Sequence, residues 1–186
     1  MPFIETAFPG LLIFDPVVFS DNRGFFFESF NSKTFGQQGI TDHFVQDNQS
    51  LSNYGVIRGL HYQLNPHAQS KLIRVLTGEI LDVAVDIRQG SPTFGKLFSI
   101  ELSAENKKQL YIPKGFAHGF SVLSKTAEVL YKCDSYYSKE SEGGIVFNDT
   151  ILQIDWKIPA DKTIVSEKDR QQSSFNNCRN NFVFEP

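Results

Sequence analysis

Residues 79–87 read EILDVAVDI, the clearest alternating pattern in the chain. Successive side chains of a β-strand point to opposite faces, so one face of this segment carries Leu81, Val83, Val85 and Ile87. The other face carries Asp82, Ala84 and Asp86. The pattern predicts a strand with one face in the core and a polar face opposite.

Short segments rich in strand formers recur along the rest of the chain, separated by turn residues, at intervals of about 8–12 residues. The other predicted strands cover residues 11–14, 17–19, 24–30, 44–47, 55–63, 71–76, 96–102, 109–112, 119–123 and 127–131. One short helix fits residues 32–38, and a second follows Ser166, which resembles a helix cap. This spacing indicates an all-β fold, and we expect a cupin-like jelly-roll barrel of about eight to ten strands with a few short peripheral helices.

Composition sets limits on the class of protein. The chain has 186 residues and no Gly/Ser or Pro-rich linker, so residues 1–186 are expected to form one domain. The tail after about residue 170 has few periodic signals and is predicted to be loosely ordered or to face a partner chain. A net charge of −3 gives no basic field, which argues against nucleic acid or membrane as a partner. Cys133 and Cys178 are expected to be reduced thiols, and no segment resembles a signal peptide or a membrane span, so we expect a cytoplasmic location.

The segment RGLHYQ at residues 58–63 carries the first candidate for catalysis. His61 is suited to act as a general base if a carboxylate holds its other ring nitrogen, and Asp169 and Asp82 are both candidates for that carboxylate. Arg58 lies three residues before His61, which in a regular strand places the two side chains on opposite faces. A β-bulge at Gly59 would return them to one face.

The segment PKGFAHGF at residues 113–120 carries the second histidine, His118. Cupin-like barrels commonly hold a metal with several histidines and a glutamate, and this segment matches half of that pattern. The other half fails, because Tyr62 and Gln63 follow His61 where a paired histidine is needed. We therefore expect no metal site, and interpret His118 as a hydrogen-bond donor to an anion or an oxyanion.

Cations and tyrosines outside these two segments complete the set of candidates. The candidate anion-binding residues are Arg23, Arg58, Lys71 and Lys168, with arginine suited to phosphate and lysine to a developing enolate. Tyr131 lies on a predicted apolar strand, where its hydroxyl could act as an acid. Tyr137, in a predicted loop, could stack on a nucleotide base.

Eight segments, in order along the chain, resemble the dTDP-4-dehydrorhamnose 3,5-epimerase family. The resemblance runs from about Ile4 to Asp169. The segments are DNRGFFFES (21–29), FVQDN (44–48), RGLHYQ (58–63), SPTFG (91–95), LSAEN (102–106), YIPKGFAHG (111–119), LYK (130–132) and SEG (141–143). The resemblance implies a cofactor-independent homodimer that converts dTDP-4-dehydro-6-deoxy-D-glucose, a dTDP-linked 4-keto-6-deoxy sugar, to dTDP-4-dehydro-L-rhamnose.

The resemblance also implies a role for each candidate residue. His61 would be the base, oriented by Asp169, and Tyr131 the proton donor on the opposite face of the sugar. Lys71 would face the enolate oxygen, and Tyr137 would stack on thymine. The remaining implied substrate contacts are Arg23, Glu28, Gln46, Asp47, Asn48, Arg58, His118, Glu142 and Lys168.

Other functions are alternatives to this one. Relatives that invert only one carbon, or that use a CDP-linked sugar, would share most of them. A non-catalytic barrel that binds a nucleotide-sugar would need the binding residues but no base. A metal-dependent cupin enzyme would need the missing ligands described above.

Overall fold

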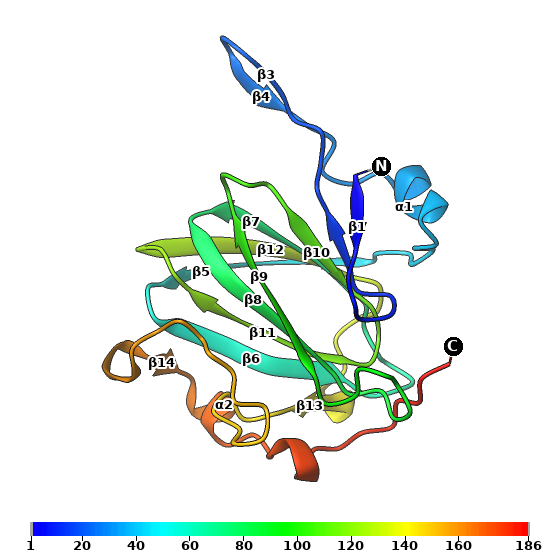
Figure 1. The fold of residues 1–186 in the computed structure, drawn as a ribbon, viewed down its shortest axis with the longest axis vertical. Coiled ribbons are helices and arrows are strands. Elements are labelled where there is room, and N and C mark those ends of the chain that lie inside the picture. Colours follow the sequence, from blue (N-terminus) through cyan, green and yellow to red (C-terminus); the bar gives the residue numbers. More distant parts are fainter. Residues whose placement is uncertain (1, 186) are drawn as a thin grey trace.

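The computed structural model describes residues 2–185 and contains two facing sheets with a core between them (Figure 1). The first sheet is antiparallel and has the strand order β1-β2-β10-β7-β12-β5. Its strands are β1 (Phe3–Glu5), β2 (Leu12–Phe14), β5 (Gln46–Asn53), β7 (Lys71–Thr77), β10 (Gln109–Ile112) and β12 (Thr126–Cys133). The predicted mostly-β, cupin-type jelly roll is confirmed.

The second sheet has the order β13-β6-β11-β8-β9, with β14 added in parallel to β6. Its strands are β6 (Val56–Gln63), β8 (Glu79–Asp86), β9 (Leu97–Ser103), β11 (Phe116–Val122), β13 (Glu142–Gly144) and β14 (Ile164–Val165). Residues from β7, β8, β11 and β12 share one apolar cluster, among them Ile73, Ile80, Phe120 and Val129. The sheets therefore pack face to face, as in a sandwich.

Both faces of β8 are buried, and the polar face predicted for this segment points into the barrel rather than to solvent. Val83 and Val85 pack in a second apolar cluster, on the outer face of the second sheet, together with Trp156. The opposite face of β8 looks into the barrel, and Asp82 and Asp86 on it have no exposed surface. Buried carboxylates need partners, so this face indicates polar structure inside the barrel.

The helices are short and lie outside the sheets. Helix α1 (Ser32–Gln37) begins after Asn31, whose side chain accepts hydrogen bonds from two backbone N–H groups. Helix α2 (Glu167–Arg170) begins after Ser166, as predicted, and Ser166 accepts from the N–H of Asp169. Three 3₁₀ turns cover Lys139–Ser141, Ala160–Lys162 and Phe175–Asn177. Helix α2 places Asp169 beside β6.

Strands β3 (Phe19–Asp21) and β4 (Gly24–Phe26) form a separate hairpin that projects from the body of the molecule (Figure 1). The predicted strand 24–30 therefore ends earlier than expected. Three phenylalanines of this hairpin are largely exposed, namely Phe19 (64%), Phe25 (60%) and Phe26 (71%). Exposed aromatic groups of this extent are typical of a surface that contacts another chain.

The tail over residues 171–185 packs along its own barrel, which disagrees with the loosely ordered alternative, while a tail that also faces a partner chain stays a prediction. The Phe182 side chain is 5% exposed and belongs to the apolar cluster on the outer face of the second sheet. Backbone bonds fix the same segment, because Gln89 N–H donates to the Phe182 carbonyl and Phe184 N–H donates to the Gln89 carbonyl. Apolar burial and backbone pairing hold a segment whose sequence has no periodic pattern.

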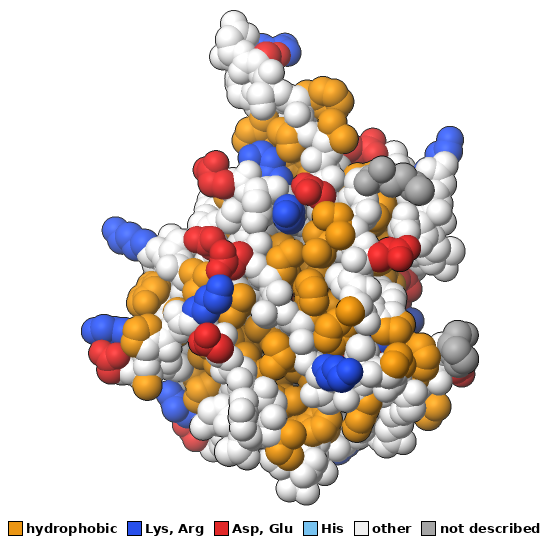
Figure 2. All heavy atoms as spheres, in the orientation of Figure 1, with side chains coloured by type: hydrophobic (Ala, Val, Ile, Leu, Met, Phe, Trp, Pro, Cys, Tyr) orange, Lys and Arg blue, Asp and Glu red, His pale blue; other side chains and the backbone are white. Residues whose placement is uncertain are grey.

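Two surface properties bear on partners. Figure 2 shows acidic and basic side chains interspersed on the face in view, rather than gathered by sign. Within the part of the chain that the structure describes, no helix has the length and apolar character to cross a bilayer.

Candidate active site

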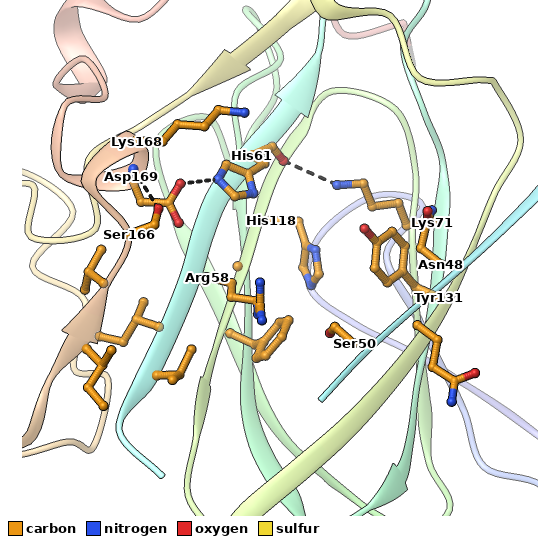
Figure 3. A pocket seen from close by; sticks show the side chains of 17 residues that line it. Asn48, Ser50, Arg58, His61, Lys71, His118, Tyr131, Ser166, Lys168 and Asp169 are labelled. Carbon is orange, nitrogen blue, oxygen red and sulfur yellow. Dashed lines mark hydrogen bonds and ion pairs between the residues drawn. The ribbon is translucent and has the colours of Figure 1, made fainter. Parts of the chain in front are cut away.

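A cavity of about 650 Å³ opens between the two sheets. The second sheet contributes Arg58, His61, His118 and Phe120, and the first contributes Asn48, Lys71 and Tyr131 (Figure 3). Helix α2 closes one side with Lys168 and Asp169. Eight of these nine residues are polar or charged, which is far from the composition of the surrounding core. The cavity is therefore built for a polar ligand.

A bulge in β6 brings Arg58 and His61 to one face, as predicted. On the neighbouring strand β11, His118 pairs with His61 and Phe120 pairs with Arg58. Two residues of β6 between these pairs therefore lie opposite one residue of β11. Gly59 lies in this bulge with φ +121°, and a Cβ atom there would lie 2.5 Å from the Cα of Gly119. Only glycine fits this close approach.

His61 and Asp169 form a hydrogen-bonded pair at the edge of the cavity. The His61 Nε2 atom lies 2.6 Å from Asp169 Oδ1 (Figure 3). The N–H of Gly59 donates to Asp169 Oδ2 at 3.3 Å. Burial raises the pKa of Asp169, but the hydrogen bonds and the charge of His61 outweigh burial and leave this pKa below its usual value. Of the two carboxylates that the sequence offered, Asp169 is the partner of His61.

This pairing determines which nitrogen of His61 can act as a base. An ionised carboxylate only accepts hydrogen bonds, so Nε2 of His61 carries the proton that it shares with Asp169. In the neutral ring, Nδ1 then has the free lone pair. The His61 side chain is partly exposed to the cavity, whereas Asp169 is 3% exposed. The pair can therefore accept a proton from a bound molecule.

A second histidine–carboxylate pair lies deeper in the barrel. His118 Nε2 lies 2.6 Å from Oδ1 of Asp82, the buried carboxylate on the inner face of β8. Burial lowers the pKa of His118, and the charge of Asp82 opposes this shift without cancelling it. The neutral ring again carries its proton on Nε2, so its Nδ1 accepts a hydrogen bond. The prediction that His118 donates to an anion or an oxyanion stays a prediction, and this geometry favours acceptance at Nδ1 instead.

Lys71 and Tyr131 reach the cavity from the sheet opposite His61. The Lys71 ammonium donates a long hydrogen bond of 3.5 Å to the carbonyl of His61. Burial lowers the pKa of Lys71, while Cys133 and Asp82 oppose that effect. Burial also raises the pKa of Tyr131, so its hydroxyl stays protonated at neutral pH. The cavity thus has a base on one sheet and an acid and a cation on the other.

Two cations lie nearer the opening. Arg58 is held by a hydrogen bond of 3.0 Å from its Nε to Ser52 Oγ, which leaves the other guanidinium N–H groups free to bind a ligand. Lys168 forms an ion pair with Glu142, and the hydrogen bond from this pair raises the pKa of Lys168. Both cations line the larger cavity, as a site for an anionic ligand requires.

A smaller cavity of about 200 Å³ adjoins the first and shares Asn48, His61, Lys71 and Tyr131 with it. Gln46, Tyr137 and Glu142 line this second cavity. The loop that carries Tyr137 is fixed by amide side chains, because Gln46 Oε1 accepts from the Tyr137 N–H at 3.3 Å. Together the cavities form an elongated space with the reactive groups at their junction.

Three predicted substrate contacts do not reach this space within one chain. Asp47 lies on the outer face of β5 and pairs with Lys132, because the alternation of the strand sends its neighbours Gln46 and Asn48 inward. Arg23 lies at the turn of the projecting hairpin, where it bonds Asp21. Glu28 follows that hairpin and is exposed.

Some residues of the site were not found from the sequence. Ser50, Phe120 and Ser166 line the larger cavity, and Gln63 and Gln69 line the smaller one. Alternation along β5 and β11 could have placed Ser50 and Phe120 on the same faces as Asn48 and His118. Within residues 2–185, no group of three or more His, Cys, Asp and Glu side chains is arranged to hold a metal ion.

Comparison with known proteins gives the family. Residues 5–177 match the family profile described as dTDP-4-dehydrorhamnose 3,5-epimerase. The chain belongs to the dTDP-4-dehydrorhamnose 3,5-epimerase family. It is 54% identical over 176 residues to the dTDP-4-dehydrorhamnose 3,5-epimerase of Shigella flexneri, an alignment that covers 94% of this chain and 96% of that protein.

Solved structures of this epimerase family have the same fold. The dTDP-4-dehydrorhamnose 3,5-epimerase of Elizabethkingia anophelis matches with a TM-score of 0.91 and 54% identity, covering 94% of this chain and 96% of that one. The dTDP-6-deoxy-D-glucose-3,5-epimerase of Legionella pneumophila, solved with dTDP-4-keto-L-rhamnose, matches with a TM-score of 0.90 and 51% identity, covering 94% of this chain and 93% of that one. The resemblance inferred from the sequence is confirmed.

Proposed function

We propose that this protein inverts C3 and C5 of dTDP-4-dehydro-6-deoxy-D-glucose to give dTDP-4-dehydro-L-rhamnose, without a cofactor. One observation carries the proposal beyond the family. The His61–Asp169 pair and the Tyr131 hydroxyl come from opposite sheets and line the same cavity. A base and an acid on opposite sides of one sugar ring are what inversion of a carbon centre needs.

The chemistry of the sugar suits a single base. Carbons 3 and 5 both flank the C4 ketone, so removing a proton from either one produces an enolate on the same oxygen. His61 Nδ1 takes the proton, and Asp169 stabilises the imidazolium that forms. The Lys71 ammonium stabilises the negative charge on the C4 oxygen in a site shielded from water.

Tyr131 then returns a proton to the opposite face. Its hydroxyl is the protonated form at neutral pH, because burial raises its pKa. After the transfer the phenolate is reprotonated and the imidazolium loses its proton, so the enzyme returns to its starting state. Repeating the sequence at the second carbon gives double inversion.

The rest of the elongated space suits a nucleoside diphosphate. Arg58 and Lys168 carry the charges that a diphosphate needs, and arginine can bind phosphate oxygens in a bidentate manner. Tyr137 offers a ring for stacking on thymine, beside the amides of Gln46 and Asn48. Glu142 is released from Lys168 when the diphosphate binds, and can then accept a hydrogen bond from the nucleoside.

We also propose that the protein is a homodimer with a location in the cytoplasm. The hairpin that carries Arg23 projects away from the body of its own chain and exposes three phenylalanines (Figure 1). Arg23 and Glu28 can contact a nucleotide-sugar only if the hairpin reaches the cavity of a second copy. The two cysteines are unpaired, which fits a reducing compartment.

Product analysis tests the proposed reaction. Purified protein, treated with a chelator and then freed of it, is incubated with dTDP-4-dehydro-6-deoxy-D-glucose, and the sugar is followed by proton NMR. The expected product has both C3 and C5 inverted. Inversion at one carbon would identify a single-centre epimerase, and binding without any conversion would identify a non-catalytic binding protein.

A further inference from the structure

Asp82 lies beneath the cavity rather than in its lining. It has no exposed surface, and it lies opposite Phe120 in the β8–β11 ladder, next to the position of His118. One of its oxygens, Oδ1, binds His118 at 2.6 Å. The other, Oδ2, is the buried side-chain atom that has no hydrogen-bond partner within residues 2–185.

An unpaired buried carboxylate oxygen is destabilising, because it has lost its hydration without gaining a hydrogen bond. Lys71 lines the cavity together with His118, the partner of Asp82, and it too is poorly satisfied, since its one hydrogen bond within the described chain is the long contact to the His61 carbonyl. The negative charge of Asp82 acts on Lys71, whose pKa burial lowers and Asp82 raises. The negative charge of Asp82 therefore stabilises the positive charge of Lys71, although no hydrogen bond or ion pair joins the two side chains within residues 2–185.

Other titratable groups around Lys71 do not supply this counter-charge. The groups that face it are Tyr131 and Cys133 from β12, His61 from β6, His118 from β11 and Asp82 from β8. Burial raises the pKa of both Tyr131 and Cys133, so both are neutral at pH 7. Burial lowers the pKa of His118, so it is neutral as well.

We propose that Asp82 is a positioning residue with two tasks, which rest on the proposed function of the cavity. Its Oδ1 holds the His118 ring with the proton on Nε2, so that Nδ1 accepts a hydrogen bond from a sugar hydroxyl. Its charge keeps Lys71 protonated, so that the enolate oxygen meets an ammonium group. Lys71 is then the cation at the enolate, and His118 orients the sugar.

Asp82→Asn tests the second task, because it keeps the size of the side chain and removes the charge. We expect kcat to fall about tenfold, less than the loss of a direct donor to the oxyanion, with KM changed less than about threefold. Lys71 acts in its protonated form, so activity is lost as pH rises through its pKa. Without Asp82 that pKa falls, and the alkaline limb of the kcat profile should move down by about one pH unit.

Asp86→Asn is the matched control. Asp86 lies on the same face of β8, is equally buried, and binds Arg88, Ser91 and Thr93 away from the cavity. This variant should lose stability but keep the alkaline limb in place. If the alkaline limb of the kcat profile also stays in place in Asp82→Asn, the proposed role of Asp82 as the counter-charge of Lys71 is wrong, whatever the stability or kcat of that variant.

The first task is measured on the wild-type protein, so it does not depend on turnover. Long-range proton–nitrogen NMR of the histidine rings reports the tautomer, and His118→Gln assigns the signal. We expect a neutral His118 ring with its proton on Nε2 between pH 6.5 and pH 8. A proton on Nδ1, or a charged ring in this range, would overturn the proposal even if the epimerase reaction is observed.

Discussion

We propose different chemical roles for two histidines of the same cavity, because their carboxylates differ in surroundings. His61 and His118 both bind a carboxylate through Nε2, and both therefore direct Nδ1 elsewhere. Asp169 also accepts the N–H of Gly59, whereas one oxygen of Asp82 has no hydrogen-bond partner within residues 2–185. The residue type alone does not distinguish a base from a binding group. In this proposal, the hydrogen-bond partner and the burial of each histidine ring distinguish them.

Tyr131→Phe tests the acid of the proposed reaction. The ring is retained, so the fold and the nucleotide affinity should change little, but the proton for the opposite face is lost. We expect epimerised product to fall on the order of 10²-fold or more, while exchange of the abstracted proton with solvent continues.

The matched control for this variant is Tyr54→Phe, which removes the hydroxyl of an exposed tyrosine that does not line the cavity. The measurement is proton NMR of the sugar in deuterated water. A Tyr131→Phe protein that forms the inverted product at the wild-type rate would assign the acid to another group.

At the scale of the elements, the apolar alternation in the sequence predicted the buried strands but missed most of β5, whose side chains are mainly polar. Strand β5, Gln46–Asn53, has the sequence QDNQSLSN, and the prediction stopped at residue 47. Its inward side chains face the cavity and its outward ones face solvent, so no apolar face marks it. Strand β11 begins at Phe116, earlier than predicted, for the same reason, since His118 interrupts its apolar pattern.

The sequence nevertheless predicts most of the site. The motif at residues 58–63, the bulge at Gly59 and the cap at Ser166 are local features, and local chemistry sets them. The pairing of Asp82 with His118 is set by the register between β8 and β11, which no local pattern encodes. The position of the hairpin near Arg23 also depends on tertiary packing.

The C-terminal segment is an element without periodicity, and its stability can be measured. Phe182→Ala removes a buried ring from the outer apolar cluster, and we expect the free energy of unfolding to fall by about 3 kcal/mol. Val183→Ala is the control, because Val183 is 70% exposed and should change stability by less than about 0.5 kcal/mol. Equal effects in urea denaturation would mean that the tail is not docked in solution.

At the scale of the whole molecule, the proposed dimer predicts complementation. Arg23→Ala loses a contact that the hairpin supplies to the partner, and His61→Ala loses the base of its own cavity, so each variant alone should be nearly inactive. A mixed dimer has one cavity with both groups intact, and equal mixing after dissociation should restore about a quarter of the wild-type activity. No recovery, with mixed dimers demonstrated by mass spectrometry, would place Arg23 outside the site.

The account depends most on one imidazole that removes protons on both sides of a ketone. Its most direct test is deuterium incorporation into dTDP-4-dehydro-6-deoxy-D-glucose in deuterated water, measured by NMR and mass spectrometry. The wild-type protein should place deuterium at both C3 and C5, and His61→Asn should place it at neither, while His67→Asn, an exposed histidine outside both cavities, should behave as wild type. Incorporation at both carbons by the His61→Asn protein would contradict the account.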